Sequence, residues 1–419
     1  MQLNFPTVAL PSILILMDPR IYSLVAVAAL GYFVDIFDLA LFGIVRVQSL
    51  KDLGISDAEL LPVGVKLLNS QMLGLLFGGL FWGVLGDRWG RLKVLFGSIL
   101  LYSLANLANA FVQTASIYAL LRGLAGVGLA GELGAAITLV SETLPKEKRG
   151  YGTAVVAGVG LSGAVAAGVL AEWVSWRVTY IVGGVLGLLL LLLRLKVAES
   201  PLFNQLKTQK QISRGNLLLL FSPPKRLLKY LSCILVAVPI WFCAGILMTF
   251  APELGEALHT QEPLSAGRAI LFSYIGVAIG DILSGLLSQW LKSRKKVVLG
   301  ALVIEAFLIA FILTRTHLHS STFYFFSFLI GLATGYWAVF VTVTSEQFGT
   351  NLRSTATTSA PNWVRASVVP MTLCLTFLRP HWGLLPSISF IGAVVFLLAG
   401  ISLFFIEETF ARDLDFYEE

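Results

Sequence analysis

Charged residues are scarce in this sequence. Asp, Glu, Lys and Arg make up 13% of the 419 residues, against roughly 25% in an ordinary soluble domain, and hydrophobic residues make up 57%. Apolar runs of about 20 residues recur along the chain, which is the length that a helix needs to cross a bilayer, whereas barrel strands would alternate over about 10. The composition therefore predicts an all-α integral membrane protein.

Cysteine and histidine are also rare, and their positions do not suggest a metal site or a disulfide framework. The cysteines fall inside apolar runs and are expected to be small core residues: Cys233, Cys243 and Cys374. The histidines fall in predicted external loops, where we expect solvated side chains: His259, His317, His319 and His381. A GxxxxGK[ST] phosphate loop is missing, which argues against direct ATP hydrolysis on this chain. We expect no metal, no cofactor and no enzymatic activity.

The formal net charge of +6 could suggest nucleic acid as a partner, but its distribution predicts a membrane topology instead. Lys and Arg are concentrated in the segments between alternate apolar runs, which predicts an inner-membrane protein with both termini in the cytoplasm. The first twenty residues lack the basic start of a cleaved signal peptide, and two prolines interrupt their apolar run. Met17 is an alternative start.

Hydropathy predicts twelve spans in two halves. The domains are expected at 1–20 (N-terminal segment), 21–195 (six-helix bundle), 196–230 (basic cytoplasmic linker), 231–406 (six-helix bundle) and 407–419 (acidic tail). The predicted spans are 21–45, 63–85, 94–112, 117–140, 151–171, 179–195, 231–251, 269–291, 297–313, 323–344, 356–377 and 384–406.

The two halves repeat one another. Gly83 aligns with Gly285 at an offset of 202 residues, and SETLPKEKRG aligns with SEQFGTNLRS at 204. Because each half has an even number of spans, the copies have the same orientation, as in a parallel repeat about an axis along the membrane normal. We therefore predict two pseudo-symmetric six-helix bundles with a central cavity between them. Two GxGxxG strings, 126–131 and 158–163, lie inside apolar runs and predict close helix packing rather than dinucleotide binding.

At these residues the sequence resembles the major facilitator superfamily, over nearly its whole length. The most specific match is the signature loop between spans two and three, made by Gly79, Gly83, Gly86, Asp87, Arg88, Gly90 and Arg91. The sugar-porter and metabolite:proton-symporter branches are resembled by Arg122, by Gly131 with Glu132, by ETLPKEKRG (142–150) and by ESP (199–201). The opening FVDIFDLALFGIVRVQSL (33–50) and the ending EETFARDLDFYEE (407–419) look similar to bacterial carriers grouped with the phagosomal amino-acid transporters of intracellular pathogens.

Two departures narrow the resemblance. Span seven, VAVPIWFCAG, lacks the paired glutamines typical of hexose carriers, and span five lacks the glycine-proline signature of drug:proton antiporters. These departures make a sugar carrier and a drug exporter less favoured interpretations.

Two acidic residues lie within the first span. Asp35 and Asp38 are three residues apart and therefore share one helix face. An intramembrane carboxylate costs roughly 2.5 to 3.5 kcal/mol on insertion scales, so such groups usually face a wet cavity or carry an exchangeable proton. The resemblance implies that a first-span Asp faces a fourth-span Arg, here Arg122. We predict Asp38, with Asp35 and Arg122, as the proton-coupling group; a static salt bridge or a helix contact is the alternative.

Candidate substrate residues lie mainly in the second half. Arg365 in span eleven needs an anionic partner and is predicted to receive a substrate carboxylate; the alternative is pairing with Glu305 or a backbone carbonyl. Glu132 could hold a substrate amine or pack against another helix. Around Arg365 we expect aromatic and polar walls from Trp241, Tyr336, Trp337 and Asn362.

The charged cytoplasmic segments are predicted to form a gate. Such ion pairs contribute little individually when solvated, but a network present in only one state would bias the alternation between states. Its predicted members in the first half are Gly83, Asp87, Arg88, Arg91, Glu142, Arg149 and Glu199, with a weaker counterpart at Glu346, Arg353 and Glu407.

The sequence thus predicts a monomeric, proton-coupled carrier that imports a small polar metabolite by alternating access. An amino acid or another small carboxylate is the first substrate class. The alternatives are a nucleoside or polyol symporter, a proton-driven efflux antiporter, or a sensor that binds without transport.

Overall fold

The computed structural model describes residues 19–89, 91–132, 149–194 and 217–410, and every regular element in these ranges is helical. The first half contains α2 (Pro19–Asp52), η1 (Asp57–Glu59), α3 (Leu60–Trp89), α4 (Arg91–Asn109), α5 (Ala115–Leu129), α7 (Arg149–Trp173) and α8 (Trp176–Arg194). The second half contains η2 (Leu217–Phe221), α10 (Pro224–Phe242), η3 (Cys243–Met248), α11 (Ala251–Ala257), α12 (Ala266–Trp290), α13 (Arg294–Leu313), α14 (Ser320–Thr334), α15 (Trp337–Gln347), α16 (Thr350–Ala366), α17 (Val368–Trp382) and α18 (Leu384–Phe405).

The helices have the length and surface of membrane spans. Within the described ranges, nine helical segments are long and apolar enough to cross a bilayer, and Ala115–Leu129 is a shorter apolar helix. Large apolar side chains such as Phe77, Phe307 and Phe404 are exposed on the outside of the bundle, where lipid would cover them. Trp173 and Trp290, at the ends of α7 and α12, are 82% and 77% exposed, as expected for interfacial anchors. The chain is a multi-pass membrane protein.

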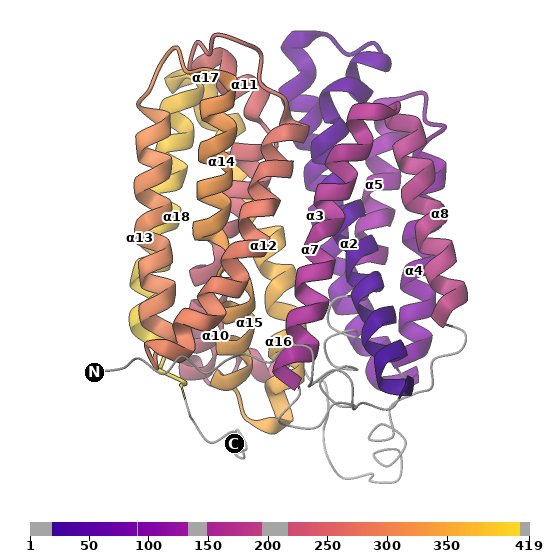
Figure 1. Ribbon diagram of the computed structural model, residues 1–419, viewed down its shortest axis with the longest axis vertical. Coiled ribbons are helices and arrows are strands. Elements are labelled where there is room, and N and C mark those ends of the chain that lie inside the picture. The colour runs from indigo at the N-terminus through magenta and orange to yellow at the C-terminus, as the bar shows by residue number, and fades with distance from the viewer. Residues whose placement is uncertain (1–18, 90, 133–148, 195–216, 411–419) are drawn as a thin grey trace, which may run out of the picture.

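The two halves form two bundles that pack in the same way (Figure 1). In the first half α2 packs on α7, α3 on α5, and α4 on α8; in the second half α10 packs on α16, α12 on α14, and α13 on α18. These pairs are spans 1–5, 2–4 and 3–6 and their equivalents six spans later. Between the bundles, α7 packs on α12 and α16 packs on α3, which is again a symmetric exchange.

Close helix packing through glycine is part of this repeat. A side chain on Gly74 or Gly78 of α3 would collide with the backbone of α5, and one on Gly276 or Gly280 of α12 would collide with the backbone of α14. The two pairs are separated by the same 202 residues found between the signature glycines. The two GxGxxG strings also behave as predicted, because Gly126 lies against the Gln71 carbonyl and Gly163 against the Phe33 carbonyl.

Three predicted spans of the second half are not continuous α-helices. Span seven passes from α10 into the π-helix η3, span ten is interrupted at Gly335 and Tyr336, and span eleven changes from α16 to α17 at Ser367. Pro370 in the first turn of α17 has no N–H to donate and its ring would clash with the helical carbonyl four residues earlier, which favours this break. In addition, α10 begins at Pro224, ahead of the predicted start at 231.

Candidate functional site

The centre of the site is a pair of opposite charges from the two halves. Asp35 of α2 and Arg365 of α16 are 0% and 1% exposed, and Oδ2 of the aspartate lies 3.7 Å from Nη2 of the arginine. Neither carboxylate oxygen accepts a hydrogen bond, and the Nε and Nη1 of Arg365 donate none. The sequence predicted both residues but not their pairing; Arg365 pairs with Asp35 rather than with Glu305 or a carbonyl.

Two tyrosines and an asparagine surround this pair. Tyr32 of α2 and Tyr274 of α12 are buried and lie close enough to Asp35 and Arg365 to interact with both charges. Asn362, one turn before Arg365 on α16, donates weakly to the Ala130 carbonyl of the first half at 3.5 Å, and its Oδ1 accepts no hydrogen bond. The site thus holds unused donors on Arg365 and unused acceptors on Asp35 and Asn362.

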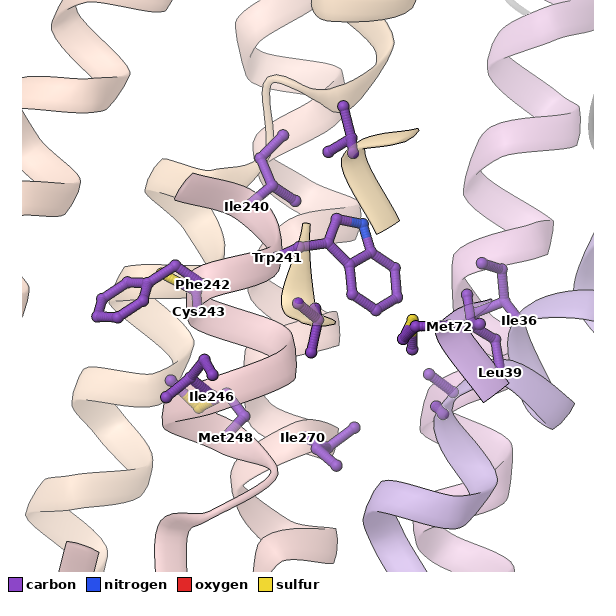
Figure 2. Packing of buried hydrophobic residues seen from close by; sticks show 14 of the residues in the cluster. Ile36, Leu39, Met72, Ile240, Trp241, Phe242, Cys243, Ile246, Met248 and Ile270 are labelled. Atoms are coloured by element: carbon purple, nitrogen blue, oxygen red, sulfur yellow. The ribbon is translucent and has the colours of Figure 1, made fainter. Parts of the chain in front are cut away.

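Trp241 supplies an apolar wall at the interface between the halves. Its indole extends from α10 toward Ile36 and Leu39 of α2 and Met72 of α3 (Figure 2). The side chain is 7% exposed and belongs to the same apolar core as those residues. Its place in a substrate site stays a prediction, whereas Tyr32 and Tyr274, which the sequence had not singled out, lie near Asp35 and Arg365.

Asp38 points into the first half instead of across the interface. It is fully buried, its carboxylate accepts no hydrogen bond, and its Oδ1 lies against Gly183 of α8, where any side chain would collide with it. Arg122 of α5 is its neighbour, as predicted, but Nη2 donates to the Asp38 backbone carbonyl at 3.3 Å and not to the carboxylate. Nη1 of Arg122 donates to Oδ1 of Asn106 at 3.1 Å. In this arrangement the two charges are adjacent and not ion-paired.

Tyrosines continue from Arg122 toward the end of the bundle where α2 finishes, the upper end in Figure 1. The guanidinium lies 5.6 Å from the centre of the Tyr180 ring. The Tyr180 and Tyr118 hydroxyls are 2.7 Å apart, and Tyr118 donates to Ser49 Oγ at 3.3 Å. All three hydroxyls are buried, so Arg122 is held in a preorganised aromatic and polar surround.

Two predicted substrate residues already have protein partners. Glu132 forms a buried, two-bond ion pair with Arg194 of α8, which neutralises it without a substrate amine. Tyr336 is fully buried and donates to the Val236 carbonyl of α10 at 3.0 Å, inside the second half. Trp337 begins α15 and packs on Phe340 with ring centres 5.3 Å apart. The contacts of these three residues therefore join helices or turns within their own half of the protein.

Most of the predicted gate lies beyond what the structure describes. Gly83, Asp87, Arg88, Arg91 and Arg149 lie on described helices, but the four charged side chains, and all of Glu142 and Glu199, fall outside the described residues.

The second-half counterpart of the gate is visible. Glu346 pairs with Arg294 at 3.2 Å and accepts from Thr409 at 2.6 Å. Arg353 donates to the Ser345 carbonyl at 3.0 Å, and Gln347 donates to the Glu407 carbonyl at 2.7 Å. This network joins α13, α15 and the segment after α18.

A second ion pair joins the halves at the upper end. Arg46 of α2 is fully buried and donates to Oε2 of Glu253 in α11 at 2.7 Å and to the Thr249 carbonyl at 3.2 Å. Thr372 also donates to Asn69 across the interface at 2.7 Å, and Arg268 pairs with Glu172 at 2.8 Å on the surface. Sequence reasoning missed Arg46, although a basic residue directly following an apolar span was a usable signal.

Residues 28–369 match the profile of the Major Facilitator Superfamily. The chain belongs to this superfamily. The major facilitator fold is also seen in its similarity to the crystal structure of a D-xylose-proton symporter, with a TM-score of 0.71 at 17% identity over 93% of this chain and 99% of that one. The twelve-helix architecture and the assignment as a transporter rather than an enzyme are therefore confirmed.

Two curated relatives of this major facilitator are transporters of small metabolites. The niacin transporter of Acinetobacter baylyi is 30% identical over 183 residues, which cover 43% of this chain and 41% of that protein. The gentisate transporter of Corynebacterium glutamicum is 25% identical over 350 residues, which cover 79% of this chain and 76% of that protein. The chain thus matches less than half of the first relative's length and about three quarters of the second.

Proposed function

We propose that this protein imports a small carboxylate together with protons by alternating access. The observation that carries the proposal is Arg365, a nearly fully buried guanidinium between the two halves. Two of its donor nitrogens are unused, and among the described residues its one charged partner is the Asp35 carboxylate, 3.7 Å away. Planar carboxylates are the ligands that a guanidinium binds best, through two parallel hydrogen bonds. Niacin and gentisate, the solutes after which the two relatives are named, both carry a carboxylate.

The arrangement couples such a ligand to a proton. A substrate carboxylate on Arg365 would take over the charge that Asp35 now balances, and an unpaired buried carboxylate is strongly unfavourable. Asp35 would therefore bind a proton as the substrate binds. Asp38, three residues along the same helix, would titrate jointly with it. The proton is released when the cavity opens to the other side and Arg365 returns to Asp35.

Arg122 adjusts the proton affinity of Asp38. In the structure its guanidinium is held by the Asp38 carbonyl, Asn106 and Tyr180, within reach of the carboxylate but not paired with it. A small rotation that moved Nη2 from the carbonyl to the carboxylate would favour the charged form and release the proton. This is the alternation that the sequence predicted for the pair. We place it in the inner membrane, with substrate and proton delivered to the cytoplasm.

The aromatic groups near Arg365 extend the substrate class to planar carboxylates. Tyr32 and Tyr274 lie near the charged pair, and Trp241 extends across the interface between the halves; such rings stack on flat ligands. Amino acids remain within the class, because their carboxylate would use the same arginine. A nucleoside or polyol has no carboxylate and would leave Arg365 paired with Asp35.

The proposal is tested with the purified full-length protein. A thermal-shift screen at two pH values would compare niacin, gentisate, proline, a nucleoside and a polyol, and the ligands found would be followed as radiolabelled solutes in proteoliposomes. We expect carboxylates to stabilise the protein and to accumulate under an inward proton gradient. Stabilisation by the nucleoside or polyol alone would contradict the carboxylate site. Depletion of internal solute under the same gradient would indicate an exporter.

A further inference from the structure

A third buried carboxyl lies in the second half, away from Asp35 and Asp38. Glu305 of α13 is fully buried, and its Oε1 is contacted by Sγ of Cys243 at 2.8 Å and Oγ1 of Thr334 at 3.1 Å. Its Oε2 accepts no hydrogen bond. Among the described residues no cation pairs with it, although an ionised buried carboxylate normally requires one. This carboxyl therefore has a place for a proton and no other charge to balance it.

Glu305 touches two of the interrupted spans. Cys243 is the first residue of the π-helix η3 in span seven, and Thr334 is the last residue of α14, directly before the break in span ten. After the break, Asp281 of α12 accepts from the Ala338 N–H at 3.0 Å and so caps the start of α15. Interrupted helices in transporters are where coupling ions and conformational changes concentrate.

The hydrogen atoms at Thr334 allow two arrangements. Its Oγ1 lies 2.8 Å from the Ile330 carbonyl and 3.1 Å from Oε1 of Glu305, but a hydroxyl has a single hydrogen to donate. If Thr334 donates to Ile330, the contact with Glu305 requires a proton on the carboxyl. If Glu305 is ionised, Thr334 turns to donate to it. The protonation state of Glu305 thus selects the rotamer of the hydroxyl at the edge of the break.

The other titratable groups around Glu305 are few. Tyr336, which follows the break, interacts with both Glu305 and Cys243. Neither α14 nor α18 carries a charged side chain. Of the remaining helices packed on α13, α12 carries Arg268 and Asp281 and α15 carries Glu346. The charges of α13 itself, other than Glu305, are Arg294, Lys295 and Lys296 in its first turn.

We propose that Glu305 is a second proton-binding site of this transporter, placed in the second half and coupled through Thr334 and Cys243 to the interruptions of spans ten and seven. Its protonated form stabilises the arrangement seen here, in which Thr334 keeps its bond to Ile330. Loss of the proton turns the Thr334 hydroxyl from Ile330 toward the carboxylate and strengthens the hydrogen bond that the Cys243 thiol already donates to it, which changes the contacts at the break between α14 and α15. The site does not depend on the identity of the substrate.

The thiol of Cys243 provides a direct probe, because the infrared S–H stretching band reports the strength of the hydrogen bond that the thiol donates. Replacement of Cys233 and Cys374 by Ala in the full chain leaves Cys243 as its single thiol. Spectra are recorded between about pH 4 and about pH 9, the range over which a buried Glu can titrate. We expect the band to move between two positions as Glu305 gains and loses its proton. The Glu305→Gln variant should keep one position at every pH.

A matched control separates this site from the proton-coupling pair. In Asp38→Asn the S–H band should move with pH as in the parent, because Asp38 lies in the other half. A band that does not move in the parent, or that still moves in Glu305→Gln, would overturn the proposal. The carboxyl C=O band in the same spectra checks the assignment, since Glu305→Gln should remove one protonated-carboxyl component without change of the helical amide bands. Failure here would leave the import mechanism at Asp35 and Asp38 unaffected, because that is judged by solute uptake.

Discussion

Asp35 of the first half and Arg365 of the second half face each other 3.7 Å apart in a fully buried setting, and neither completes its hydrogen bonds. Because most hydrogen-bonding groups of this pair are unused, the two residues are well placed to exchange partners. A carboxylate ligand offers Arg365 better geometry than Asp35 does, and protonation of Asp35 removes the cost of that exchange.

Replacement of Arg365 tests this pair. Arg365→Gln should abolish carboxylate binding, and Arg365→Lys, which keeps the charge but loses the planar fork, should weaken it by about tenfold or more. Binding is measured by thermal shift and calorimetry on the purified protein. Arg365→Gln also leaves Asp35 without a counter-charge, which should cost up to about 3–5 kcal/mol of stability at a pH where Asp35 stays ionised, and less where Asp35 takes up a proton.

The double variant distinguishes stability from binding. Asp35→Asn in the Arg365→Gln background should restore the melting temperature without restoring carboxylate binding. Arg315→Gln, in the exposed loop after α13, is the control and should change neither the melting temperature nor carboxylate binding. Carboxylate binding at the parental affinity in Arg365→Gln would exclude this residue as the receptor.

The buried ion pair of Arg46 and Glu253 should hold the two halves together at the upper end, and we call it the latch. Glu253→Gln removes the charge that balances a fully buried guanidinium, so the arrangement seen here should lose about 3–5 kcal/mol, less what the hydrogen bonds to the Thr249 and Leu60 carbonyls retain. The melting temperature should fall, and cysteines introduced near Arg46 should become more reactive to a membrane-impermeant thiol reagent.

Glu172→Gln is the matched control, because Arg268 and Glu172 also join the halves but are about half exposed. Exposed pairs contribute about 0.2–1 kcal/mol, so this change should have a much smaller effect. Equal effects of the two substitutions on melting temperature and thiol reactivity would refute the latch.

Glu408, after the end of α18, should make the stability of the second half depend on pH. Burial raises the pKa of this carboxyl, but hydrogen bonds from Ser293 and from the N–H groups of Arg294, Phe410 and Lys295 outweigh it and hold the pKa below its ordinary value of 4.5. A lowered folded pKa means that the carboxylate stabilises the fold above the unfolded value of about 4.5, and that this is lost as pH falls through the folded value.

The Glu408→Gln variant should therefore melt at a lower temperature than the parent at pH 7, with the difference shrinking as pH falls below about 4.5. Glu256→Gln, at an exposed position, is the control and should have the melting temperature of the parent at pH 7 and at pH 3.5. A difference between Glu408→Gln and the parent that stays constant down to pH 3.5 would show that the carboxylate charge is not responsible.

The fold was predictable because its signals are local. Apolar runs indicated the spans, and the 202-residue offset indicated the repeat. The structure shows this repeat at Gly74 and Gly276, each of which packs against the backbone of a neighbouring helix. The intramembrane charges Asp35, Asp38, Arg122 and Arg365 were found because lipid makes such residues costly and therefore rare. The helix breaks were harder, because Asp281 stabilises the start of α15 from a different helix.

Apart from Arg122 beside Asp38, which the family resemblance implied, the partners of the site residues could not be predicted, because they depend on how the bundles pack. Glu132 is satisfied by Arg194 and Tyr336 by the Val236 carbonyl, each from a span distant in sequence. The contact between Asp35 and Arg365 joins residues more than 300 positions apart. Sequence reasoning identified which groups needed a partner but could not determine which partner each would find.

The most direct test of proton coupling is uptake of an identified carboxylate into proteoliposomes with an inward gradient of one pH unit and the voltage held at zero. One proton carried with one monoanion is electroneutral, so the parent protein should accumulate the solute about tenfold. Asp38→Asn should only equilibrate it, to equal concentrations on both sides, while still exchanging labelled for unlabelled solute. Accumulation by Asp38→Asn to the parental level would contradict the account.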